Sequence, residues 1–172
     1  MNKFTESNIT LSFPDSNFFR FADCAGYQQL SGNHFKEMDA CWYDINENLY
    51  WLIELKDFTQ ASLTTLETID SKSWDIVKKA IDSLSMFLSS KHKYSYSTKL
   101  NDCFPSAIPN SLTQFKFITI IHCSDSQKPD VQLIHNTFRN RFKPYAELFG
   151  IQHYGVIEHS KAIKNIPNNM VQ

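Results

Sequence analysis

Two acidic side chains and a lysine are spaced so that they could act together on a phosphate ester. Asp39 lies 15 positions before Glu54, and Lys56 follows Glu54 by two. Alternate residues of a β-strand share a face, so Glu54 and Lys56 would point the same way from one extended segment. Two carboxylates held close together repel each other, and a divalent cation removes that repulsion. Hard oxygen ligands at this density suit Mg²⁺ or Mn²⁺ better than Zn²⁺.

The chemistry expected of this set is hydrolysis. Asp39 and Glu54 would hold the ion, with the backbone carbonyl of Leu55 as a third ligand. The ammonium group of Lys56 would orient the attacking water or stabilise charge that develops on a phosphate oxygen. The alternative is a structural one, in which Glu54 and Lys56 belong to an exposed strand whose alternating charges serve solubility.

A β-hairpin would bring these side chains together. Residues 35–43 and 49–57 are rich in aromatic and aliphatic side chains, and polar residues separate the two runs. A hairpin centred between Asn46 and Glu47 pairs Asp39 with Glu54 on one face. A slip of one residue would pair Asp39 with Ile53 instead. On that register, alternation assigns Met38 to the face opposite Asp39.

The remaining pattern predicts a single α/β domain over residues 1–172, with a mixed central β-sheet flanked by helices. A helix capped at Asp70 or Ser71 runs to about residue 90, with Trp74 and Val77 on its apolar face. A crossover then leads to a strand at 115–123, and a second helix opens at Pro129. Further expected segments are strands at 8–13, 18–22 and 154–157, one helical turn or a loop at 25–30, a long loop at 94–114, a kink or end at Pro144, a stop at Gly150 and a frayed tail after Ile166.

The hairpin residues resemble those of a known group of enzymes. EMDACWYD followed by LIELKD is similar to the hairpin of the PD-(D/E)xK phosphodiesterases, which include restriction endonucleases, Holliday-junction resolvases and DNA-repair nucleases. The resemblance implies a restriction-endonuclease-like core with the order α-β-β-β-α-β. It implies that Asp39 and Glu54 are metal ligands, that Lys56 is the catalytic lysine, and that the substrate is nucleic acid, DNA more than RNA. The motif covers residues 36–57, and the expected topology covers residues 18–123.

The chain also departs from that pattern. Met38 stands where the motif has proline, and Pro14–Asp15 lies too far from Glu54 to replace it. No Q-x-x-x-Y signature follows the hairpin, and the preceding helix is missing or very short. Two other functions therefore remain open. One is a catalytically inactive nuclease-like binding module, or a subunit of a larger defence or repair assembly. The other is a small interaction protein such as an inhibitor or immunity factor.

The charge distribution favours a polyanion partner. Residues 1–70 carry 4 Lys or Arg against 11 Asp or Glu, and residues 71–172 carry 13 against 7. An acidic cluster followed by a basic half suits a cation site beside a nucleic-acid surface. The residues expected to touch phosphates are Lys78, Lys79, Arg139 and Arg141. Two alternatives are structural. Cations near helix ends also stabilise the helix dipole, and chance segregation of charged, solvent-exposed faces along the chain would give the same balance of charges. A homodimer or a partner protein would suit cleavage of two strands.

Cysteine usage and the N-terminus indicate a cytoplasmic protein without a membrane segment. The four cysteines form no C-x-x-C pair and no zinc-finger spacing, so free thiols in a reducing compartment are expected. Residues 1–10 do not look like a signal peptide, and no apolar run is long enough to span a bilayer.

Overall fold

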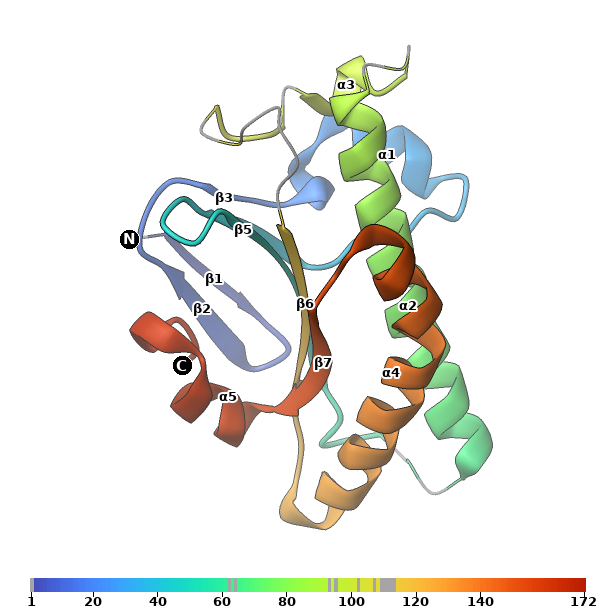
Figure 1. Ribbon diagram of the computed structural model, residues 1–172. Helices are drawn as coiled ribbons and strands as arrows, with labels where there is room; N and C mark the ends of the chain where they lie inside the picture. The colour runs from blue at the N-terminus through green and yellow to red at the C-terminus, as the bar shows by residue number, and fades with distance from the viewer. Residues whose placement is uncertain are drawn as a thin grey trace.

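The computed structural model describes residues 2–61, 63, 65–92, 94, 96–101, 103–106, 108 and 114–172. A mixed five-stranded sheet forms its centre, in the order β3-β4-β5-β6-β7 (Figure 1). Strand β4 runs antiparallel to both neighbours, and β5, β6 and β7 are parallel. The strands of this sheet are β3 (Phe18–Phe19), β4 (Ala40–Asp44), β5 (Leu49–Asp57), β6 (Gln114–His122) and β7 (His153–Glu158). The expected mixed sheet flanked by helices is therefore confirmed.

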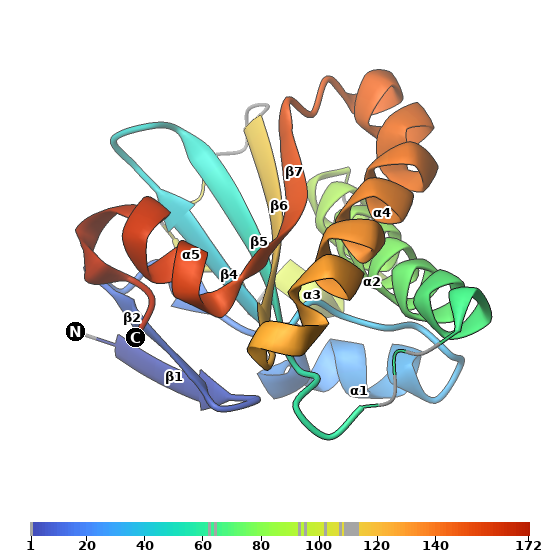
Figure 2. The same cartoon turned by 90° about the horizontal axis from the view of Figure 1, so that it is seen from below.

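Helices cover one face of this sheet, and a small hairpin with the C-terminal segment covers the other. Figure 2 shows α2 and α4 side by side on the first face, and β1, β2 and α5 on the second. The α-helices are α1 (Ala25–Ser31), α2 (Leu66–Lys91), α3 (Thr98–Asn101), α4 (Lys128–Phe149) and α5 (His159–Asn165), and the hairpin strands are β1 (Asn2–Glu6) and β2 (Ile9–Phe13). Short 3₁₀ turns are η1 (Phe21–Asp23), η2 (Asp125–Gln127) and η3 (Pro167–Asn169).

Side-chain alternation along β5 divides the core into two clusters. Tyr50 and Leu52 face the helices α2 and α4, while Trp51 and Ile53 face the β1–β2 hairpin and α5. All four side chains are buried, because both faces of the central strand are covered. The even-numbered residues of β5 therefore point toward α2, and this direction carries Glu54 and Lys56 with it.

The hairpin has the register that the sequence predicts. Asp44 pairs with Leu49 and Ala40 pairs with Ile53, so the next position brings Asp39 opposite Glu54. Met38 breaks the expected alternation, because β4 begins only at Ala40. Its side chain packs in the cluster on the α2 face, and its backbone N–H donates to the Ser83 hydroxyl of α2 at 2.9 Å.

Helix α2 differs from its expected bounds and face. It begins at Leu66, and the Thr65 hydroxyl accepts from the Thr68 N–H at 3.1 Å as its N-cap. Trp74 is 48% exposed instead of buried, because Ile76 and Val77 take the positions that face the sheet. In α4, Pro144 lies inside the helix without ending it, and Gly150 closes the helix at φ +65° as expected.

The C-terminal segment is docked, which contradicts the expected frayed tail. Met170 and Val171 are buried against the β1–β2 hairpin. The backbone groups of Gln172 exchange hydrogen bonds with Thr10 at 2.8 and 2.9 Å. Strand β1, for which no expectation existed, is the outer strand of that hairpin.

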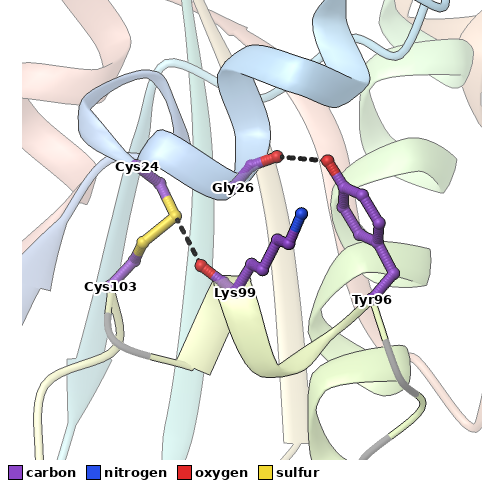
Figure 3. The surroundings of a disulfide bond; sticks show 5 residues. All are labelled: Cys24, Gly26, Tyr96, Lys99 and Cys103. Atoms are coloured by element: carbon purple, nitrogen blue, oxygen red, sulfur yellow. Dashed lines mark hydrogen bonds between the residues drawn. A yellow bond between two sulfur atoms is a disulfide. The ribbon is translucent and has the colours of Figure 1, made fainter.

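A disulfide joins Cys24 to Cys103, so the expectation of four free thiols is wrong. Figure 3 shows the bridge at the point where α1 meets α3, and Cys41 and Cys123 stay free. Gly26 permits this contact, because a Cβ there would lie 2.5 Å from the Lys99 carbonyl oxygen. The Tyr96 hydroxyl donates to the Gly26 carbonyl at 3.0 Å. The loop expected at 94–114 thus contains α3, while Pro109, on which that expectation relied, lies outside the described residues.

None of the helices in the described ranges is long and apolar enough to cross a membrane.

Candidate functional site

Asp39 and Glu54 meet on the α2 face of the β4–β5 hairpin. Asp39 precedes β4 and Glu54 lies near the end of β5, where the register makes them neighbours. Oδ2 of Asp39 accepts from the Leu55 backbone N–H at 2.7 Å, which fixes the carboxylate across the two strands. The fold therefore places side by side the two acids that the sequence predicted as metal ligands.

A lysine from α2 lies between these carboxylates. Nζ of Lys79 lies 3.2 Å from Oδ1 of Asp39 and 2.7 Å from Oε1 of Glu54. Lys79 is close enough because α2 crosses over the end of β5 on this face of the sheet. Burial disfavours the charge of Lys79, but the charges of Glu54 and Asp39 outweigh it and raise the pKa of the ammonium group.

Glu54 is the most deeply placed charged group of the site. Its side chain is fully buried, and its Oε2 has no hydrogen-bond partner among the described residues. Desolvation and the neighbouring charge of Asp39 raise the pKa of Glu54 to about 7, against the opposing effect of Lys79 and Lys56. A buried carboxylate oxygen without a partner is costly, so this atom is available to a further donor or cation.

Lys56 occupies the open side of the cluster. Its Nζ lies 2.5 Å from Oε1 of Glu54, and its side chain is 30% exposed, whereas that of Lys79 is 18% exposed. Lys56 therefore reaches from solvent to the buried carboxylate. This is the position that an ammonium group needs if it is to contact both Glu54 and an incoming phosphate.

Two further charged side chains border the site. Nε of Arg20 donates to the Asp39 backbone carbonyl at 3.1 Å, and the Arg20 guanidinium also pairs with Asp23. Glu37 is half-buried, and burial raises its pKa, with a smaller contribution from the charge of Asp39. The carbonyl of Leu55, expected as a metal ligand, accepts from the Ser7 hydroxyl at 3.2 Å.

The four residues expected to contact phosphates lie in different environments. Lys78 pairs with Asp82 at 2.7 Å, and Lys79 with the two acids of the site. Arg141 pairs with Asp70 and stacks on Trp74. Arg139 has no carboxylate partner among the described residues; it stacks on Tyr154 and donates to the Tyr154 carbonyl at 3.2 Å.

Lys79 is the site residue whose position the sequence did not reveal. It is 40 positions from Asp39, and the sequence predicted that it contacts phosphates and not the two acids. One signal was available, since Lys79 falls between the buried residues Val77 and Ala80, close to the apolar face. Among the described residues, His, Cys, Asp and Glu side chains form no group of three or more suited to a metal ion.

Comparison of the chain with protein-family models, with curated proteins and with solved structures found no match in any of the three.

Proposed function

We propose that this chain is a metal-dependent phosphodiesterase that hydrolyses nucleic acid, DNA more than RNA. The observation that carries the proposal is the convergence of Asp39, Glu54 and Lys56 at one end of a β-hairpin, in the register that the resemblance to PD-(D/E)xK nucleases requires. The helix α2 and the parallel strand β6 follow that hairpin in the expected order. The helix α1 follows the first strand of the sheet instead of preceding it, so the match to a restriction-endonuclease-like core is partial.

The oxygen atoms around the site fit Mg²⁺ or Mn²⁺. Among the described residues, Oε2 of Glu54 is buried without a hydrogen-bond partner, and Oδ1 of Asp39 has an ammonium group as its one partner. With the Leu55 carbonyl they would supply three hard ligands, and water would complete the coordination. A bound ion would contribute positive charge that polarises the phosphate ester and lowers the pKa of the attacking water.

The residues of the chain would then have distinct tasks. Asp39 and Glu54 hold the cation, and the Leu55 N–H keeps the Asp39 carboxylate in place. Lys56, which is partly exposed, contacts the phosphate oxygen on which negative charge grows. Lys79 has to move away from at least one carboxylate, because an ammonium group and a divalent ion at the same oxygen atoms repel each other.

A second function is favoured by one specific observation. Lys79 and Lys56 already balance the charges of Asp39 and Glu54, which is what a structural cluster would do without any metal. On this basis the alternative is a non-catalytic nuclease-like module that binds nucleic acid or serves as a subunit of a defence or repair assembly.

Cleavage assays with matched variants separate these functions. Supercoiled plasmid and labelled single strands are incubated with Mg²⁺ or Mn²⁺, or with a chelator, using wild type, Asp39→Asn, Lys56→Met and the control Lys164→Met on α5. The proposal expects metal-dependent cleavage that falls about 10²-fold or more in the first two variants and is unchanged in the control. Calorimetric titration with Mn²⁺ accompanies each assay. Binding of nucleic acid without cleavage in any metal would establish the module instead, and absence of both would overturn the two readings.

A further inference from the structure

Arg139 belongs to a basic hollow at the β7 edge of the central sheet. Its lining includes Lys116 on β6, His135 and Arg139 on α4, and His153, Tyr154 and Gly155 on β7. We call this cavity the β7 hollow; it has a volume of about 370 Å³. No carboxylate is among its described lining residues, whereas the cationic residues Lys78, Lys79 and Arg141 each have an acidic partner.

Lys116 is the cation in this hollow that most lacks a counter-charge. Its ammonium group forms no ion pair or hydrogen bond with any residue in the described ranges, and Nζ lies 3.8 Å from the centre of the Trp51 ring. Half-burial lowers the pKa of Lys116, with no carboxylate to oppose the effect. An ammonium group that is partly desolvated and faces only an aromatic ring gains from a neighbouring anion.

The cationic residues of the hollow come from both faces of the sheet at its β7 edge. Lys116 and His153 are register partners and share one face of the sheet, while Arg139 stacks on Tyr154 from the α4 side. Between them lies Gly155, where a Cβ would approach the His135 ring to 3.0 Å. The absence of a side chain at Gly155 therefore makes room for the His135 ring, which contacts the Val156 backbone at this edge.

Side chains supply the positive charge of the hollow among its described lining residues. The N–H of Val156, on the free edge of β7, already donates to Nδ1 of His135 at 3.1 Å. A small free anion would be held by convergent N–H groups, as at a phosphate-binding turn. Cationic side chains spread along an open edge instead match an extended chain of phosphates, which proteins contact mainly through Lys and Arg.

We propose that the β7 hollow binds successive backbone phosphates of a nucleic-acid strand, one at Lys116 and one at Arg139, with His153 at its rim. The choice of nucleic acid as the partner rests on the proposed function. The hollow lies at the β7 edge of the sheet, whereas Glu54 and Lys56 lie on β5, from which β6 separates it. It is thus a second contact region, separate from the acidic cluster.

Binding measured without cleavage tests this proposal apart from the proposed hydrolysis. Fluorescence anisotropy of a labelled single-stranded oligonucleotide is recorded in chelator for wild type and for the double variant Lys116→Gln/Arg139→Gln. Lys143→Gln, on the same helix but paired with Glu147, is the matched control. His153→Glu at the exposed rim supplies a variant that leaves the packing on Trp51 intact.

The double variant is expected to bind at least tenfold more weakly, with a salt dependence reduced by about one to two phosphate contacts. His153→Glu is expected to weaken binding in the same direction, and Lys143→Gln is expected to bind as wild type does. Equal affinity of wild type and the double variant would overturn the proposal. So would equally strong competition by inorganic phosphate or by poly-glutamate, because these would indicate a free anion or an acidic peptide as the ligand.

Discussion

Lys79 on α2 places its ammonium nitrogen 2.7 Å from Oε1 of Glu54 on β5. This contact joins the helix layer to the sheet at the point where the sequence leads one to expect a metal ion. The same ammonium group reaches Asp39 at 3.2 Å, so one lysine contacts both carboxylates. The ion pairs stabilise the metal-free fold. A divalent cation can bind the same oxygen atoms when Lys79 moves away from at least one of them.

Replacing Lys79 should destabilise the protein in a pH-dependent way. Lys79→Met leaves Glu54 buried with Lys56 as its one remaining cation among the described residues, and removing one member of a buried pair costs about 3–5 kcal/mol. The loss should be larger at pH 8 than at pH 6, because at the lower pH Glu54 takes up a proton and needs no partner. Urea unfolding at both pH values measures this loss of stability.

Lys78→Met is the control for that variant, since Lys78 forms an exposed pair with Asp82 that contributes less than about 1 kcal/mol. Adding Mn²⁺ should restore part of the stability of Lys79→Met while leaving Lys78→Met unaffected. Equal stability of the two variants in the absence of metal would show that the Lys79 contacts contribute nothing.

Glu54 should make stability fall as the pH rises toward neutrality. Its pKa is about 7 in the folded protein against a reference of 4.5, so the folded state holds the proton more tightly than the unfolded chain. The resulting stabilisation is fully present below pH 4.5 and is lost as the pH rises through 7. Within this window the slope from this group approaches about 1.4 kcal/mol per pH unit.

Glu54→Gln should remove that slope, because an amide cannot take up the proton. Urea unfolding between pH 4.5 and 8 compares this variant with wild type and with Glu147→Gln, an exposed site on α4. A variant that keeps the wild-type pH dependence would show that another group is responsible.

Loss of the Cys24–Cys103 bridge should lower the free energy of unfolding by about 2–4 kcal/mol, because the bridge closes a loop across 79 positions and restricts the unfolded chain. The double variant Cys24→Ser/Cys103→Ser is compared with Cys123→Ser, which changes a free thiol. Thiol titration of the denatured protein should find two reactive groups before reduction and four after it. Stability that does not change on adding a dithiol reductant would contradict the expectation.

Gly26→Ala should destabilise the contact between α1 and α3. The added Cβ would lie 2.5 Å from the Lys99 carbonyl oxygen and 2.8 Å from its carbon, so backbone must shift, at a cost of about 1–3 kcal/mol. Gly32→Ala is the matched control, because its Cβ would meet the nearest atom at 3.6 Å and its φ is −61°. Thermal unfolding of both variants measures the difference in stability. An equal midpoint for the two would refute the close approach of Gly26 to the Lys99 backbone.

The sequence by itself determined the local elements and the pairing of the hairpin. Alternation along β5 predicted that Glu54 and Lys56 share a face, and a turn centred between Asn46 and Glu47 predicted Asp39 opposite Glu54, the register that the structure has. These features depend on residues close together in the chain, where strand geometry links sequence spacing directly to direction in space. The crossover from β5 to the parallel strand β6 followed from the length of the intervening segment.

Only the tertiary structure decided what surrounds those residues. The contact of Lys79 with Glu54, the bridge between Cys24 and Cys103, and the hollow around Lys116 each join segments that are far apart in sequence. Their formation depends on how α2, α3 and α4 pack on the sheet, and helical periodicity gives the buried face of each helix without giving its partner across that face. The burial that raises the pKa of Glu54 arises from the same packing, and so no spacing in the chain could indicate it.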